Sequence, residues 1–176
     1  MEREMRSRRI VVGLDGSEGS SRALQWVVDT AKPLDAEVVA VHVHHLAAYL
    51  PAAMGVTPPM DTRKWYEELQ RAFTQDWCAP LRRAGVRYRP VFDDGTAPAA
   101  SSLMRIAQQE GADMIVVGSR GLGGFAELLL GSVSHQLAHH SPIPVVIVPP
   151  VQKEVARESK PAVQAAVQRG TLAPIF

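Results

Sequence analysis

Two glycine- and serine-rich segments have the composition of an anion-binding site. The first, Gly118–Gly124, reads GSRGLGG and directly follows the apolar run Met114–Val117, and the second, Gly131–Ser134, reads GSVS. Glycines allow backbone N–H groups to approach an anion, because no Cβ atom stands in the way. A helix that begins at or near the second segment would add unpaired N–H groups, the positive end of its dipole and two serine hydroxyls. Together the two segments could hold a di- or triphosphate from two sides.

The structural alternative is that these glycines only make tight turns between a strand and a helix, as glycine does in many proteins. Two donor segments within one strand–helix unit favour the phosphate interpretation. The pattern is not a Walker loop, because no G-K-[ST] closes it. It is not the dinucleotide fingerprint either, since the first expected strand–helix turn, Gly13–Ser17 (GLDGS), lacks G-x-G-x-x-G.

Asp15 is the acidic residue that we expect beside these segments. In a doubly wound sheet, ligands bind at the carboxyl ends of the strands, where the order of the strands reverses. We expect this reversal between the first and fourth strands, so that Asp15 at the end of one meets Gly118–Gly121 at the end of the other. The structural alternative for Asp15 is an Asx turn or a cap before the first helix.

Five short apolar segments, separated by stretches of helical periodicity, predict the strands that position these residues. They are Arg9–Leu14, Glu37–Val43, Arg87–Phe92, Met114–Val117 and Val145–Val148. Several are nearly continuous β-branched runs, which is typical of parallel strands covered on both faces. Strands that alternate with helices predict right-handed crossovers, and therefore an α/β fold with a doubly wound, five-stranded parallel sheet sandwiched by helices.

Capping residues and prolines predict where the helices begin and end. The expected helices are Ser17–Lys32, a helix from Thr62 that ends or kinks at Pro80, a helix from Thr96 with Pro98 in its first turn, and a helix over Leu128–Leu137 that stops at residues 139–142. The aromatic residues of the second helix, Trp65, Phe73 and Trp77, recur at helical spacing, which indicates core packing.

The ordered set of these segments resembles the universal stress protein family. Gly118-x2-Gly121-x9-Gly131-Ser132 is similar to the family's ATP-binding signature in full spacing, and Ile10–Ser17 is similar to its opening segment. Val41–Val43 resembles the family's second strand, and Ser141–Val148 resembles its closing segment. The likeness covers residues 8–149, which we interpret as one nucleotide-binding domain of the Rossmann-like, universal stress protein type. Residues 150–176 are expected to form a tail, partly disordered or with one short helix, and residues 46–61 a long loop.

The resemblance implies a set of ATP-binding residues, with Mg²⁺ as the companion of the phosphates. The residues implied at the nucleoside are Gly13, Leu14, Asp15, Val43, Val117 and Gly118. The residues implied at the phosphates are Gly121, Gly131, Ser132, Val133 and Ser134, with Arg120 nearby. The resemblance also implies a homodimer through the last strand, Val145–Val148, whose free edge would pair with its own copy.

Three functions are open at this point. The leading hypothesis is an ATP-binding regulatory protein of the stress response, whose nucleotide state controls its conformation or the binding of an unknown protein partner. The alternative is a slow ATPase, or a phosphoryl- or nucleotidyl-transfer enzyme, in which Asp15 orients a metal bound to the phosphates. The absence of an evident general base beside Asp15 favours binding over catalysis. A third possibility is an interaction module with a vestigial site, which the intact glycine pattern disfavours.

The composition and the net charge limit which partners and which cellular compartment are expected for this protein. The formal net charge is +1, with 46% hydrophobic and 21% charged residues, so nothing electrostatic favours nucleic acid or an anionic membrane as partner. The one cysteine, Cys78, excludes an intramolecular disulfide and a zinc site of paired thiolates. With no apolar stretch long enough for a signal peptide or a membrane span, a cytoplasmic location is expected.

The six histidines invite a metal interpretation. No acidic or cysteine ligands stand beside them in the sequence, so no metal site is expected there. His139 and His140 are better explained as residues that favour the negative end of a helix dipole.

Overall fold

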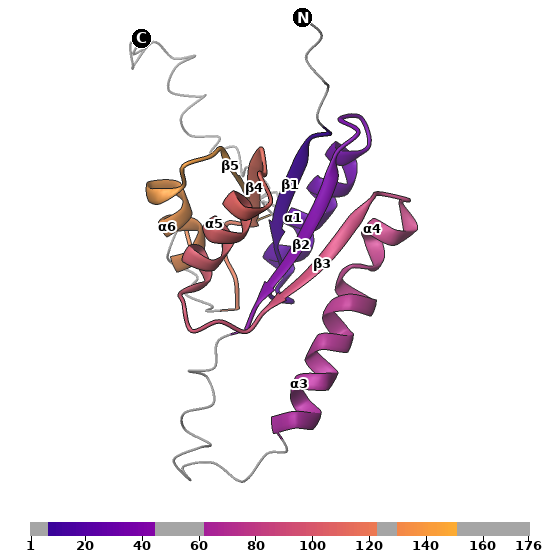
Figure 1. The fold of residues 1–176 in the computed structure, drawn as a ribbon, viewed down its shortest axis with the longest axis vertical. Coiled ribbons are helices and arrows are strands. Elements are labelled where there is room, and N and C mark those ends of the chain that lie inside the picture. Colours follow the sequence, from indigo (N-terminus) through magenta and orange to yellow (C-terminus); the bar gives the residue numbers. More distant parts are fainter. Residues whose placement is uncertain (1–6, 45–61, 123–129, 151–176) are drawn as a thin grey trace, which may run out of the picture.

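The computed structural model describes residues 7–44, 62–122 and 130–150. Its strands are β1 (Arg9–Gly13), β2 (Glu37–Val43), β3 (Tyr88–Asp93), β4 (Met114–Gly118) and β5 (Val145–Val148). They form one parallel sheet in the order β3-β2-β1-β4-β5 (Figure 1). The five predicted strands and the doubly wound α/β fold are therefore confirmed, and the chain order reverses between β1 and β4, as expected.

The helices cover both faces of the sheet. They are α1 (Glu18–Ala31), α3 (Thr62–Arg71), the π-helical turn η2 (Ala72–Trp77), α4 (Ala79–Arg83), α5 (Ala99–Gln109) and α6 (Ser132–His140). Alternate residues of the buried strands point to opposite faces, which divides the core in two. Ile10, Val12 and Val116 pack with α1, η2 and α4, whereas Val11, Ile115 and Val117 pack with α5 and α6.

Two helix starts differ from the prediction. The helix expected from Thr96 begins at Ala99, because Pro98 is the extended N-cap (φ −53°, ψ 145°), and a residue that precedes proline avoids the helical region. The helix expected over Leu128–Leu137 begins at Ser132, with Gly131 as its extended N-cap. The predicted break near Pro80 is confirmed, since η2 ends at Trp77 and Pro80 lies in the first turn of α4. The 46–61 segment and the tail beyond Pro150 lie outside the described residues.

Cys78 lies at the junction of η2 and α4 and is fully buried. Burial raises the pKa of its thiol to about 11, although the charge of Arg82 opposes that effect. The thiol therefore stays protonated and inert near neutral pH, as a small apolar core residue would. Among the described residues, no helix combines the length and the apolar character needed to cross a membrane.

Candidate functional site

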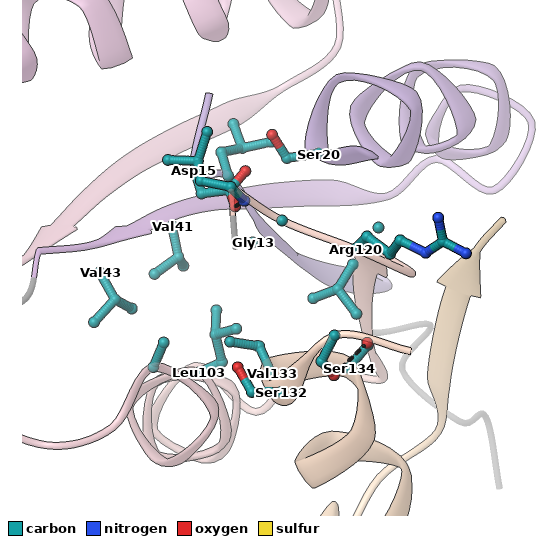
Figure 2. Close-up of a pocket in the computed structure, with 17 residues that line it drawn as sticks. Gly13, Asp15, Ser20, Val41, Val43, Leu103, Arg120, Ser132, Val133 and Ser134 are labelled. Atoms are coloured by element: carbon teal, nitrogen blue, oxygen red, sulfur yellow. Dashed lines mark hydrogen bonds between the residues drawn. The ribbon is translucent and has the colours of Figure 1, made fainter. Parts of the chain in front are cut away.

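A cavity of about 580 Å³ lies at the carboxyl ends of β1, β2 and β4. This volume is in the range of small-molecule and cofactor sites. The structure brings every residue predicted for the site to its wall: Gly13, Leu14, Asp15, Val43, Val117, Gly118, Arg120, Gly121, Gly131, Ser132, Val133 and Ser134 (Figure 2). The place of the cavity follows from the sheet order, because the crossovers diverge at the reversal between β1 and β4.

Several lining residues, most of them on the apolar wall, were not predicted from the sequence. They are Ser20, Val41, Ala99, Leu103 and Leu122. Val41 points to the same face as Val43, because side chains two apart on a strand share a face, so strand periodicity was enough to find it. Leu103 lies on the buried face of α5 opposite these valines (Figure 2). Nothing in the sequence distinguishes Ser20 from the other serines at the start of α1.

The carboxylate of Asp15 joins the loops that follow β1 and β4. Its Oδ1 accepts the N–H of Ser17 at 3.0 Å, which is the Asx turn considered as the structural alternative, and its Oδ2 accepts the N–H of Leu122 at 3.2 Å. A Cβ atom on Gly121 would collide with the same Oδ2. Asp15 thus holds the β4 loop in place, and its negative charge lies beside a residue predicted to meet phosphate.

The glycines of the signature have different tasks. A Cβ on Gly118 would lie 2.5 Å from the backbone of Gly19, so Gly118 allows α1 to cross the end of β4 closely. Gly131 has an extended backbone that any residue can adopt, and its nearest contacts to an added Cβ are ordinary ones at 3.5 Å. The fold therefore requires the absence of a side chain at Gly118, whereas at Gly131 it does not.

The start of α6 offers free hydrogen-bond donors to the cavity. Gly131 provides no side-chain cap, and the first intrahelical bond is from the N–H of His135 to the Gly131 carbonyl. The N–H groups of Ser132, Val133 and Ser134 precede it, where helix geometry leaves amides without a partner. They lie at the positive end of the helix dipole, an arrangement that suits phosphate.

The two serines of this turn differ in what they contact. Ser134 is buried, and its hydroxyl donates to the carbonyl of Ser119 at 2.8 Å. The same carbonyl accepts the N–H of Gly131 at 2.7 Å, so Ser119 ties the loop after β4 to the start of α6. Ser132 is exposed and its hydroxyl makes no hydrogen bond to a described residue. Ser134 therefore positions the helix, and Ser132 keeps a hydroxyl for a ligand.

Arg120 lines the cavity with its backbone. Figure 2 shows its guanidinium directed away from the cavity, and its Nε is shielded without a hydrogen-bond partner among the described residues. The role implied for Arg120 near the phosphates stays a prediction, and this conformation gives it no support.

His42 supports the site from the opposite face of the sheet. Burial lowers the pKa of its imidazole, while the hydrogen bond to the Leu14 carbonyl and the charge of Asp15 oppose that shift. The neutral ring must carry its proton on Nδ1, since the Leu14 carbonyl at 2.7 Å only accepts. Leu14 in turn donates its N–H to Val41 at 2.8 Å. The end of β2 thus fixes the turn that carries Asp15.

The residues present fit a nucleotide with its cation. An apolar wall faces free amides and a hydroxyl, and Asp15 is the one carboxylate among the described residues that line the cavity. Mg²⁺ in nucleotide sites is typically held by one or two carboxylates together with phosphate oxygens. No group of three or more His, Cys, Asp or Glu side chains within the described segments is arranged to hold a metal ion by itself.

Curated proteins similar to this chain include two stress proteins of Bacillus subtilis. A universal stress protein of Bacillus subtilis, YxiE, is 30% identical over 148 residues, which cover 80% of this chain and 97% of that protein. The stress response protein NhaX of the same organism is 31% identical over 160 residues, which cover 80% of this chain and 96% of that protein.

Solved structures share the fold. A universal stress protein from Burkholderia pseudomallei is 27% identical with a TM-score of 0.61, covering 81% of this chain and 96% of its own. Another universal stress protein, solved in complex with cAMP, is 25% identical with a TM-score of 0.58, covering 81% of this chain and 97% of its own. The model of the Universal stress protein family matches residues 6–149. This chain therefore belongs to the universal stress protein family.

Proposed function

We propose that this universal stress protein binds ATP with Mg²⁺ in the cavity between β1 and β4, and that the bound nucleotide regulates its conformation or partner binding in a stress response. The observation that carries the proposal is the uncapped start of α6, which faces the same cavity as an apolar wall. An apolar wall suits a base, and free amides at a helix N-terminus suit phosphates. The related structure with cAMP adds support, because its ligand is also an adenine nucleotide.

Each part of the nucleotide has a candidate partner in this arrangement. Val41, Val43 and Leu103 form the apolar wall that would take the base. The amides of Ser132–Ser134, with the Ser132 hydroxyl, would take the phosphates. Asp15 would hold the cation, and Mg²⁺ would supply neutralisation of the phosphate charge that this carboxylate otherwise repels.

Binding is favoured over catalysis because the site offers little to activate a nucleophile. Both carboxylate oxygens of Asp15 already accept backbone N–H groups. The described residues that line the cavity include no histidine, lysine or second carboxylate. Hydrolysis of ATP should therefore stay far below ordinary enzymatic turnover of ~10 per second. Steady phosphate release that disappears in Asp15→Ala, with ATP binding retained, would instead support the ATPase alternative.

The variant Gly131→Val tests the phosphate site without disturbing the fold. A Cβ atom at this position meets only ordinary contacts, and the extended backbone accepts valine, yet the side chain would stand at the start of α6 where the phosphates would lie. Calorimetry should show that this variant loses most of its ATP affinity. Gln136→Val is the matched control, because Gln136 is exposed on the same helix and does not line the cavity. Unchanged ATP affinity in Gly131→Val would refute the assignment.

The edge of β5 supports the proposal of a homodimer. Its four residues are all apolar and only half buried. The opposite edge, β3, contains the exposed residues Arg89 and Pro90, and proline lacks the N–H that pairing needs. Since charge and proline protect one edge and not the other, β5 is the edge suited to pair with a second copy.

A further inference from the structure

His135 and His139 form a side-chain pair outside the nucleotide cavity. They lie one helical turn apart in α6, both are exposed, and their ring centroids are 4.5 Å apart. Residues four positions apart on a helix project from the same face, which explains the contact. Neither imidazole makes a hydrogen bond or an ion pair with a described residue, so the ring nitrogens are available to a ligand.

The surroundings of this pair favour a cation. The sequence of α6, SVSHQLAHH, contains no lysine or arginine to repel one. His139 lies in the last turn of α6, where the helix dipole is negative.

The helix that carries the pair is firmly held. Leu137, between the two histidines, is fully buried, and the hydroxyl of Ser134 ties the first turn to Ser119. A helix anchored at both points keeps the two imidazoles close together before any ligand arrives, which lowers the cost of chelation.

We propose that His135 and His139 chelate one late first-row transition-metal ion per chain, of the class Zn²⁺, Ni²⁺ or Cu²⁺, with water completing the coordination. Neutral imidazole is a preferred ligand of these ions, whereas Mg²⁺ and Ca²⁺ prefer oxygen. No metal site was expected from the sequence, because no acidic or cysteine ligands accompany the histidines. A two-imidazole chelate does not need them. Neither histidine is among the residues that line the proposed nucleotide cavity.

Calorimetric titration of untagged, chelator-treated full-length protein tests the proposal. Cu²⁺ should bind more tightly than Ni²⁺, one ion per chain, and Mg²⁺ should not bind at these residues. His135→Gln and His139→Gln should each weaken Ni²⁺ binding at least about tenfold, since even groups that only support metal ligands are worth 10- to 100-fold. His140→Gln is the matched control, because His140 is adjacent but its ring centroid lies 6.2 Å from that of His139.

A second measurement separates chelation from unspecific binding. An ion that binds only the folded helix raises the midpoint of thermal unfolding, so Ni²⁺ should raise it in the wild type and in His140→Gln but not in the other two variants. Wild-type Ni²⁺ affinity in both His135→Gln and His139→Gln would overturn the proposal. An equal loss in His140→Gln would also overturn it, because the ion would then be held by a different set of histidines.

Discussion

Ser132 and Ser134 both carry a hydroxyl in the first turn of α6, yet their replacement by alanine should affect different properties. The change should lower the stability of the fold at Ser134 and the affinity for ATP at Ser132. The Ser134 hydroxyl is buried and donates to the Ser119 carbonyl, whereas the Ser132 hydroxyl is exposed and free of described partners. Removing a hydrogen bond of this kind costs about 1 kcal/mol. The Ser119 carbonyl keeps the Gly131 N–H as a partner, so no buried acceptor is left unsatisfied and the cost should not exceed that figure.

Ser134→Ala should therefore lower the free energy of unfolding by about 1 kcal/mol, which corresponds to a fall of about 2–4 °C in the thermal midpoint for a protein of this size. Ser132→Ala should leave stability unchanged and weaken ATP binding about tenfold, because a hydrogen bond to a charged phosphate is worth about 1.5 kcal/mol. Urea denaturation without nucleotide measures the first effect, and calorimetry measures the second. Equal stability losses in both variants, or undiminished ATP affinity in Ser132→Ala, would show that this division of roles is wrong.

Three further perturbations test other parts of the structure. Gly118→Ala should destabilise the fold by about 1–3 kcal/mol, because the added Cβ would stand 2.5 Å from the Gly19 backbone. Thermal unfolding without nucleotide measures this effect, and wild-type stability of the variant would contradict it. Burial lowers the folded-state pKa of His42, so the unfolded chain binds the proton of this imidazole more readily than the folded protein does. The free energy of unfolding should therefore keep its full value above pH 6.5 and fall as the pH drops below it. Urea titrations at several pH values should show a smaller loss of stability at low pH in His42→Asn than in the wild type. Identical pH profiles of stability for the two proteins would show that His42 is not the cause. Light scattering should find a dimer both for the full-length protein and for a chain ending at Pro150, and a full-length monomer at micromolar concentration would refute pairing through β5.

The strands and the location of the cavity were predictable from the sequence for a physical reason. β-branched runs such as Ile10–Val12 mark strands covered on both faces, and alternation with helices then dictates parallel order. Once β1 and β4 are neighbours, the residues after their carboxyl ends must meet, which is why Asp15 and Gly121 were correctly expected to converge.

The tasks of individual residues were not predictable, because they depend on close approaches between segments distant in the sequence. Gly118 and Gly131 belong to one sequence signature, but only the contact of β4 with α1 shows that Gly118 is required by the fold. The burial of Ser134 likewise depends on where the Ser119 carbonyl lies. The start of the helix near Pro98 was predicted wrongly for a local reason. Proline is compatible both with a first helical turn and with the extended cap observed.

If the proposed function is right, the cavity binds ATP and the start of α6 contributes to the affinity through the phosphates. Calorimetric titration of the full-length protein with ATP and with AMP, each in the presence of Mg²⁺, tests it most directly. The amides of Ser132–Ser134 and the hydroxyl of Ser132 should make ATP bind more tightly than AMP, and the difference should shrink in Gly131→Val. Absence of saturable binding, or equal affinities for the two nucleotides in the wild-type protein, would show that α6 does not bind the phosphates of ATP.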